Sequence, residues 1–317
     1  MHWTERVGRR LNPHDLHVFM EVVTQGNMAR AAEALAISRP VVSRTIAGLE
    51  QALGVQLLDR SPHGVEPTLY GRALLKRSIA VFDELKQSVR DIEFLGDPNS
   101  GEVRIGCTEP MAAGFVAAVI AHLTARYPQL LFQLELCTTP AQQFHVLRER
   151  KCDLVVARKW TDVLEPDMDG EFLFDDEVWV VAGPGSKWLS RRKLALADLA
   201  GEHWLLAPID LEPGSPVHEI FRASGLEVPR ASVLSYSLNV RTSLLATGRF
   251  LTIVPASVLR FGAGGLVLKV LPVELPRAAQ PVAITTLKHR MLSPAAKLFI
   301  DGAREVAGPA KMRRRRA

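Results

Sequence analysis

Hydrogen-bond donors, rather than nucleophiles or metal ligands, are the residues of this sequence whose types and spacing indicate a specific chemistry. Arg39, Ser43 and Arg44 fall on one face of a short helix predicted over residues 38–49. The other face is apolar, because its residues recur at spacings of four and three. Its members are Val42, Ile46 and Leu49. A short helix with guanidinium and hydroxyl groups on its exposed face can enter a groove of DNA and bind phosphates and base edges.

The start of this helix and the segment before it indicate how the donors are held. Ser38 is predicted to cap the helix with its side-chain oxygen, and Pro40 fits the first turn, where a missing N–H is tolerated. Residues 28–35 predict a second short helix capped by Asn27, with a turn at residues 36–37 between the two helices. This arrangement is typical of a helix-turn-helix that reads DNA, and an ordinary helical hairpin is the alternative.

The sequence carries no recognised pattern for catalysis or metal binding. Its nine histidines include no HExxH spacing, its three cysteines include no CxxC, and no GxSxG occurs. The glycine-rich residues 262–265 follow Phe261 without a strand-to-helix context, so they predict a loop rather than a phosphate cradle. We therefore expect neither an enzyme nor a bound cofactor or metal.

A longer pattern surrounds the two predicted helices and runs from residue 16 to residue 71. Its members are Leu16, Phe19, Val22, Gly26, Ala31, Ala32, Leu35, Ser38, Val42, Ser43, Ile46, Leu49, Glu50, Leu53, Gly54, Leu57, Arg60, Thr68 and Gly71. This pattern resembles the LysR-type transcriptional regulators. The sequence departs from the family at residues 27–28, at Arg39, where glutamine is usual, and at Leu58, where phenylalanine is usual. Because Arg39 is on the groove-facing side, the DNA sequence it reads is expected to differ from that of typical members.

The flanking segments complete a winged helix-turn-helix. Asn12 and Pro13 predict the start of a supporting helix, and residues 57–61 and 65–67 predict two short strands that form a wing. In winged helices the wing tip meets the DNA backbone or minor groove, so Arg60 is either a phosphate contact or a solvated strand arginine. The residues predicted to bind double-stranded promoter DNA are Arg30, Ser38, Arg39, Pro40, Ser43, Arg44 and Arg60.

Thr68 predicts the start of a long helix that runs to about residue 95. A narrow apolar stripe follows this helix, formed by Leu75, Ile79, Phe82, Leu85, Val89 and Ile92. The small winged domain cannot cover a stripe of this length, so the stripe suits packing against a second copy of the chain. In the LysR family this segment resembles the linker helix through which two subunits pair, which implies a homodimer or homotetramer with two DNA-reading helices at successive half-sites.

Turn-forming residues at 96–101 mark the clearest boundary in the sequence. Beyond it, strand-like and helix-like segments alternate, which predicts an α/β domain with parallel sheets. The alternation starts again at about Phe172, and the chain is expected to return to the first lobe near Leu271. The family resemblance implies a two-lobed periplasmic-binding-protein-like (type II) effector domain. The expected fold class is therefore α/β with an N-terminal all-α winged helix-turn-helix.

These observations divide the chain into a winged helix-turn-helix DNA-binding domain (1–67), a linker or dimerisation helix (68–95), a hinge (96–101), an effector-binding domain (102–306) and a basic tail (307–317). Lobe I of the effector-binding domain is expected at about residues 102–171 and 273–306, and lobe II at about residues 172–272.

A ligand is expected where strands end and helices begin, because open parallel sheets bind ligands beyond the carboxyl ends of their strands. Thr108 and Thr139 occupy such positions in lobe I, and Ser237 does so in lobe II. Arg158 directly follows a predicted strand and can fork onto a carboxylate. These four residues predict a small-molecule effector that is anionic or strongly polar. The alternatives are plain helix caps for Thr139 and Ser237, and a surface ion pair with Asp162 for Arg158.

Charge and cysteine content bound the remaining functions. The net charge of +5 equals the charge of Lys311 and residues 313–316, whereas residues 1–67 hold seven arginines and seven acidic residues. The basic tail is either a solvated charge run or a source of non-specific phosphate affinity. Three widely spaced cysteines suit a reducing cytoplasm, where Cys107 is either a buried thiol or a redox sensor. No apolar run approaches the roughly 20 residues that span a bilayer, and no export signal is expected.

The sequence thus predicts a cytoplasmic transcription regulator whose promoter contacts change when a small-molecule effector closes two lobes. RNA polymerase is a further partner consistent with that function, and no membrane partner is expected. The alternative is a solute-binding or catalytic α/β protein in which the N-terminal helices only support dimerisation.

Overall fold

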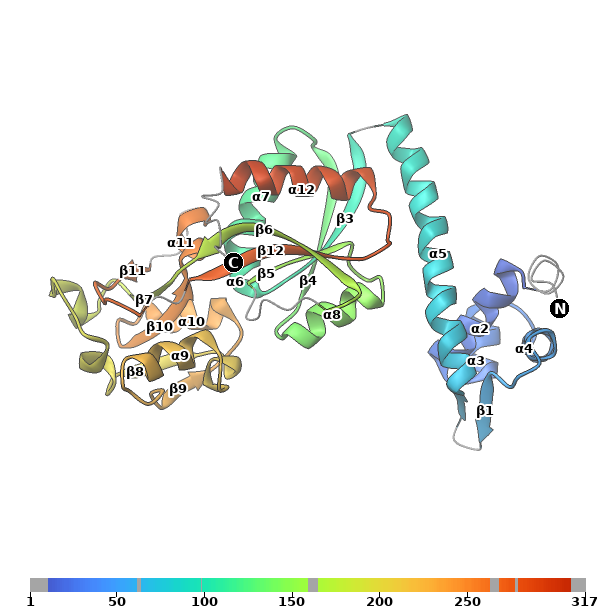
Figure 1. Cartoon of the computed structure of the whole chain (residues 1–317), viewed down its shortest axis with the longest axis horizontal. Helices are drawn as coiled ribbons and strands as arrows, with labels where there is room; N and C mark the ends of the chain where they lie inside the picture. The colour runs from blue at the N-terminus through green and yellow to red at the C-terminus, as the bar shows by residue number, and fades with distance from the viewer. Residues whose placement is uncertain are drawn as a thin grey trace. The chain divides into compact units, whose positions relative to one another are not determined.

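The computed structural model describes residues 11–61, 64–97, 99–158, 165–262, 268–276 and 279–308. The chain divides into two compact units, an N-terminal unit, Met1–Val89, and a C-terminal unit, Arg90–Ala317 (Figure 1). Within the described residues, no helix combines the length and the apolar character needed to cross a membrane. The predicted basic tail, with Lys311 and residues 313–316, lies outside the described residues.

The described part of the N-terminal unit begins with helices α2 (Pro13–Gln25), α3 (Met28–Ala34) and α4 (Arg39–Leu53). The predicted caps of the first two are confirmed, because Asn12 accepts a hydrogen bond from the backbone amide of Asp15 and Asn27 accepts one from that of Ala29. The predicted apolar stripe of α4 is also confirmed: Val42, Ile46 and Leu49 are at most 1% exposed.

The predicted side-chain cap of α4 is wrong. Ser38 stands at the N-cap with an extended backbone, but its hydroxyl makes no capping hydrogen bond. A capping oxygen accepts from the second or third amide of a helix. Pro40 is the second residue of α4 and has no N–H, and the amide of Val41 donates instead to the carbonyl oxygen of Ser38 at 2.9 Å. The exposed hydroxyl of Ser38 is therefore not used by its own helix.

A two-stranded wing and a long helix follow α4. Strands β1 (Leu58–Ser61) and β2 (Gly64–Pro67) pair antiparallel, as predicted, while the wing tip at residues 62–63 lies outside the described residues. Helix α5 (Leu69–Gly96) is capped by the hydroxyl of Thr68, which accepts from the amide of Gly71 at 3.1 Å. The predicted start of the linker helix is thus confirmed.

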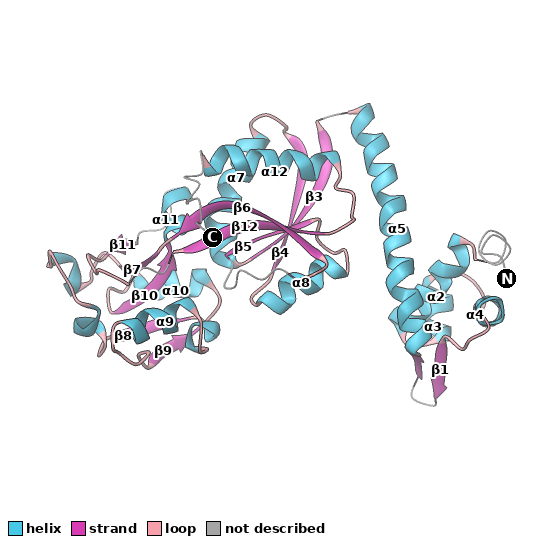
Figure 2. Ribbon diagram, viewed as in Figure 1, coloured by secondary structure: helices cyan, strands magenta, loops and turns pink. Residues whose placement is uncertain are grey.

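Lobe I of the C-terminal unit is a five-stranded sheet in the order β4-β3-β5-β12-β6. Its strands are β3 (Ser100–Cys107), β4 (Gln129–Leu136), β5 (Leu154–Arg158), β6 (Met168–Asp176) and β12 (Gln280–Leu287). Its helices are α6 (Glu109–Met111), the π-helical turn η1 (Ala112–Val116), α7 (Ala117–Thr124), α8 (Pro140–Arg148) and α12 (Pro294–Ala307). Figure 2 shows α7 and α12 on one side of this sheet and α8 on the other. Along β5, Leu154 and Val156 pack with the core that includes residues of α7 and α12, whereas Val155 and Ala157 pack with residues of α8, as the alternation of a strand requires.

Lobe II is a second five-stranded sheet, in the order β11-β7-β10-β8-β9. Its strands are β7 (Val178–Ala182), β8 (His203–Leu206), β9 (Ala231–Leu234), β10 (Phe250–Pro255) and β11 (Lys269–Val270). Its helices are α9 (Pro216–Ala223), α10 (Leu238–Leu245) and α11 (Ala256–Phe261), with short 3-10 turns at η2 (Lys187–Ser190), η3 (Leu196–Leu199) and η4 (Pro208–Leu211). The buried Trp204 and Phe221 stack edge to face at its centre.

Both sheets are mixed, which corrects the prediction of parallel sheets. Strand β12 pairs antiparallel with β5 and β6, and β10 pairs antiparallel with β7. Strand β6 ends at Asp176 and β7 begins at Val178, so the chain passes directly from the sheet of lobe I into the sheet of lobe II at this point. The start expected for lobe II at Phe172 therefore falls inside β6. On the return, Val273 and Leu275 still pack on the lobe II core.

One buried carboxylate joins several segments of the C-terminal unit. Asp153, beside the start of β5, is 0% exposed, and its Oδ1 accepts hydrogen bonds from Nη2 of Arg104 at 2.7 Å and Nη2 of Arg290 at 2.9 Å. Arg90, near the end of α5, lies 4.0 Å from the same oxygen and pairs with Glu102 at 3.0 Å. This ionic cluster fastens the end of α5 to the sheet of lobe I.

Candidate functional site

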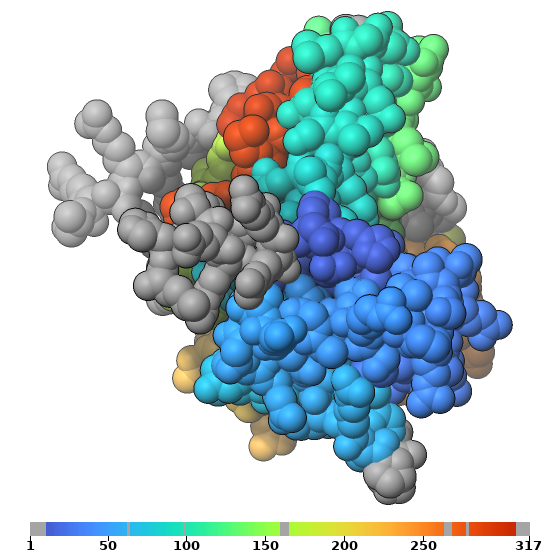
Figure 3. All heavy atoms as spheres, turned by 90° about the vertical axis from the view of Figure 1, so that its right-hand side faces the viewer, coloured from blue at the N-terminus to red at the C-terminus, as the bar shows by residue number. Residues whose placement is uncertain are grey.

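The exposed side of α4 carries the predicted DNA-reading residues. Arg39, Pro40 and Arg44 are exposed and Ser43 is half-buried, while the apolar residues of the same helix face the core. Helices α2, α3 and α4 form the blue surface of the N-terminal unit in Figure 3. The helix therefore presents donors outward and packs inward, which is the division of faces that groove binding requires.

Arg30 and Arg60 are exposed as well, the first on α3 and the second on β1. Among the described residues, no carboxylate pairs with Arg30, Arg39, Arg44 or Arg60. Their guanidinium groups are thus available to phosphates. The seven DNA-binding assignments stay predictions.

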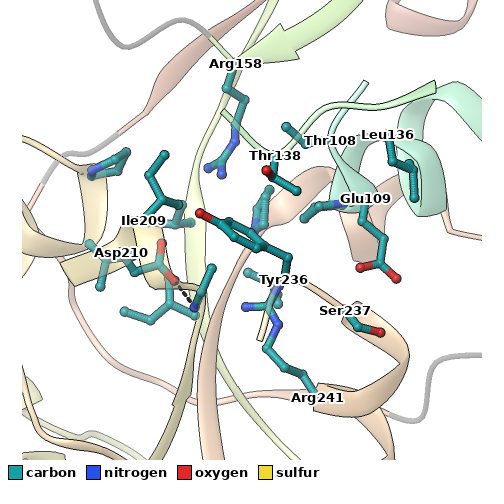
Figure 4. Close-up of a pocket in the computed structure, with 18 of the residues that line it drawn as sticks. Thr108, Glu109, Leu136, Thr138, Arg158, Ile209, Asp210, Tyr236, Ser237 and Arg241 are labelled. Carbon is teal, nitrogen blue, oxygen red and sulfur yellow. Dashed lines mark hydrogen bonds between the residues drawn. The ribbon is translucent and has the colours of Figure 1, made fainter. Parts of the chain in front are cut away.

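The C-terminal unit contains a cavity of about 300 Å³ between its two lobes (Figure 4). Lobe I contributes residues at or just after the ends of β3, β4 and β5, and lobe II contributes residues at or just after the ends of β8, β9 and β10. Three of the four predicted effector residues, Thr108, Arg158 and Ser237, line this cavity. Several of the other lining residues are apolar: Leu136, Val178, Ile209, Val217, Ile253 and Val254.

The structure does not bring Thr139 together with the other predicted effector residues. Thr139 is absent from the cavity lining, and its hydroxyl accepts a hydrogen bond from the amide of Gln142 at 3.3 Å in a capping box at the start of α8. The neighbouring Thr138 lines the cavity in its place. Ser237 does both things, because it lines the cavity and also caps α10 by accepting from the amide of Val240.

Arg158 is the last residue of β5 and reaches the cavity, as predicted. Its Nη1 atom is buried and has no hydrogen-bond partner among the described residues. Burial lowers the pKa of Arg158, and the nearby carboxylates of Asp176 and Asp210 oppose that shift. An arginine nevertheless stays protonated in a protein. Its alternative partner, Asp162, lies outside the described residues.

Arg241 was not predicted from the sequence as an effector-binding residue. It contributes a second guanidinium group to the cavity lining, from lobe II. It is 4% exposed; its Nη1 lies 3.5 Å from the hydroxyl of Thr252, and its buried Nε has no partner among the described residues. The signal was present, because Arg241 shares the buried face of α10 with Leu238 and Leu245. A charge within an apolar stripe indicates a functional position.

Two aspartates accompany the arginines. Burial raises the pKa of Asp210, although the guanidiniums of Arg241 and Arg158 lower it, and its Oδ2 accepts from the amide of Ala207 at 2.8 Å. Burial also raises the pKa of Asp176, whose two oxygens accept from the amide and hydroxyl of Ser257. Both carboxylates therefore accept hydrogen bonds from backbone amides or a hydroxyl. Some N–H groups of Arg158 and Arg241 remain without an acceptor among the described residues.

The structure gives no support to redox or metal chemistry within the described residues. Cys107 is 0% exposed, and burial raises the pKa of its thiol to about 12, so it is protonated and unreactive at neutral pH. No group of three or more potential ligands in the described part of the chain is arranged to hold a metal ion.

Comparison with known proteins covers almost the whole chain. Residues 13–72 match the family described as "Bacterial regulatory helix-turn-helix protein, lysR family", and residues 96–308 match the "LysR substrate binding domain". The transcriptional regulator GbpR of Azospirillum brasilense is 28% identical over 96% of this chain and 89% of its own length. The regulator PcaQ of Agrobacterium fabrum (strain C58 / ATCC 33970) is 27% identical over 95% of this chain and 97% of its own.

Solved structures share the fold. Full-length CbnR in complex with its target DNA has a TM-score of 0.65 and 21% identity, covering 93% of this chain and 100% of its own. Full-length BenM has a TM-score of 0.51 and 24% identity, covering 93% of this chain and 96% of its own.

Proposed function

The chain belongs to the LysR family of DNA-binding transcription regulators, and we propose that the signal it responds to is a small carboxylate held between its two lobes by Arg158 and Arg241. One observation carries this proposal: two guanidinium groups from opposite lobes line one largely apolar cavity, and each has a buried nitrogen that finds no partner within the described part of the chain. A carboxylate satisfies such donors better than a neutral group does. Members of this family regulate transcription, so the alternative of a solute-binding or catalytic protein is set aside.

A ligand that contacts both lobes shifts their relative position, because it binds one arrangement more tightly than another. We propose that this shift changes the spacing of DNA-reading units in an oligomer and thereby alters promoter contacts. We propose that the altered promoter contacts affect RNA polymerase at the same promoter. This regulation would take place in the cytoplasm.

Arg158→Ala is expected to weaken binding of the carboxylate effector by about 10- to 100-fold, because a charged hydrogen bond contributes roughly 1.5–3 kcal/mol. The effector is first sought by thermal-shift screening of the purified chain against carboxylic and sugar acids. Isothermal titration of the strongest ligand then compares wild type with Arg158→Ala. Arg148→Ala is the matched control, since Arg148 lies in the same lobe, is exposed and pairs with Asp167 and Glu165. Equal affinity in wild type and Arg158→Ala would contradict the assignment.

The reading face of α4 leads to a second expected result, which concerns DNA. Arg39→Ala is expected to lower affinity for the specific site by about 10- to 100-fold while changing non-specific affinity far less, because a guanidinium contact to a base is worth roughly 1–3 kcal/mol of discrimination. Fluorescence anisotropy with the specific sequence and a scrambled one, at fixed salt, measures both losses. Arg77→Ala, an exposed arginine on α5, is the control. Equal losses on the two sequences would show that Arg39 contacts only phosphate.

We also propose that α5 pairs with α5 of a second copy. The proximal stripe residues Leu75 and Phe82 are half-buried, with Leu75 packed on the N-terminal core and Phe82 against His17. The large apolar residues further along the helix are exposed by 43–81%: Val81, Leu85, Val89, Ile92 and Leu95. We refer to these five residues as the exposed α5 stripe. An apolar row of this length on a surface helix is typical of a helix–helix interface.

A further inference from the structure

A hydrogen bond between described residues of the two lobes crosses the cavity at Glu109. Oε2 of Glu109, the first residue of α6 in lobe I, accepts from the backbone amide of Leu238, the first residue of α10 in lobe II, at 2.6 Å. Figure 4 shows Glu109 beside Ser237, at the start of α10. Both Glu109 and Ser237 line the cavity in which we place the effector.

Two independent features make this end of α10 attractive to an anion. The first is the start of the helix, whose backbone amides carry partial positive charge. The amide of Leu238 donates to Glu109, and the amide of Val240 donates to the hydroxyl of Ser237. The second is Arg241, one turn further along α10, which lines the same cavity, is 4% exposed and keeps a buried Nε without a partner among the described residues. The carboxylate of Glu109 already binds the start of α10.

The origin of that carboxylate distinguishes it from an ordinary cap. Other side-chain caps are local: Ser215 accepts from His218, Ser293 from Ala296 and Thr139 from Gln142. Glu109 is 129 positions away from Leu238 and belongs to the opposite lobe. The bond can therefore exist only when the lobes are close, so its formation is coupled to the position of one lobe relative to the other.

We propose that Glu109 is an internal ligand of the cavity, a latch that holds the lobes together in the absence of an effector and that an incoming carboxylate displaces from α10. This inference rests on the proposed function, because it assigns the regulation of the same cavity. The effector carboxylate takes over the amide of Leu238 and the unused Nε of Arg241, and Glu109 is released. Because Glu109 competes with the effector carboxylate for the start of α10, the latch raises the effector concentration that is needed to release the lobes.

The test measures lobe position first, without any ligand. Spin labels are placed on Ala121→Cys in lobe I and Ala223→Cys in lobe II, two exposed positions, in the full chain. Wild type is expected to give one short distance, whereas Glu109→Ala gives about tenfold more of a longer one. Glu109→Gln keeps the acceptor oxygen but not its charge, so it falls between the two. Glu135→Ala, an exposed carboxylate of the same lobe, is the control and leaves the distances unchanged.

The second measurement is competition, with succinate and benzoate as probes. Affinity for these carboxylates is expected to rise about 5- to 10-fold in Glu109→Gln and further in Glu109→Ala. Unchanged lobe distances in Glu109→Ala, or unchanged probe affinity when wild type binds the probe through Arg158, overturn the latch. Opening of the lobes in Glu109→Ala, when no carboxylate binds any variant, supports the latch and overturns the effector chemistry proposed above. The two proposals therefore fail in different experiments.

Discussion

Asp153→Asn is expected to lower the free energy of unfolding of the C-terminal unit by about 3–5 kcal/mol. Its carboxylate is 0% exposed and is shared by Arg104, Arg290 and, at 4.0 Å, Arg90. Asparagine has nearly the same shape but no charge, so the buried guanidiniums lose the counter-charge that balances their removal from water. The ionic contacts that link α5, β3 and the segment of Arg290 to Asp153 are weakened at the same time.

Urea unfolding of the full chain, followed by tryptophan fluorescence, measures this loss, since Trp179, Trp188 and Trp204 all lie in the C-terminal unit. Glu171→Gln is the matched control. It also removes one carboxylate charge, from a forked contact with Arg304, but the two side chains are 40% and 52% exposed, so the expected loss is about 0–1 kcal/mol. Losses of equal size in the two variants would show that burial of the ionic cluster does not matter.

The double variant Leu85→Asp and Val89→Asp is expected to dimerise about 1000-fold more weakly than wild type. These residues of the exposed α5 stripe are 48% and 54% exposed, so pairing would bury roughly 1 kcal/mol of apolar side chain at each. In a symmetric dimer each position counts twice, which gives about 4 kcal/mol, or a factor near 1000. Weaker dimerisation also weakens binding to paired half-sites, because two reading helices no longer bind together.

Sedimentation equilibrium over a range of concentrations measures the association constant. Lys86→Asp places the same new charge on the same helix, at an exposed position outside the stripe, and is expected to leave dimerisation nearly unchanged. A double variant that dimerises as strongly as wild type would move the interface away from α5.

The N-terminal unit could be predicted closely, because local signals decide it. Asn12 and Asn27 cap their helices, Gly54 ends α4 in the left-handed conformation, and Thr68 caps α5. The exception is Ser38, where the proline two residues later removes the amide that the hydroxyl would have bound. The remaining candidate donor, the amide of Val41, binds the carbonyl oxygen of Ser38 instead of its hydroxyl.

The C-terminal unit was less predictable, because pairing between distant segments decides it. Strands β6 and β12 pair antiparallel over residues 168–176 and 280–287. Local sequence patterns do not predict which strands pair when they are more than 100 residues apart, or in which direction. The cavity shows the same limit. Arg158 could be placed because it ends a strand, whereas Arg241 becomes a cavity residue only when α10 packs beside β10. Glu109 likewise gains its role only through its contact with lobe II.

We propose that this regulator reads paired DNA half-sites and changes its contacts when a carboxylate binds between the lobes. A footprint of the full chain on DNA that it has itself selected from random sequence, recorded with and without the carboxylate found by thermal shift, tests both parts together. We expect protection of two half-sites about one helical turn apart, with an extent that changes when the ligand is added. Identical footprints with and without a ligand that binds through Arg158, or no sequence preference at all, would contradict it.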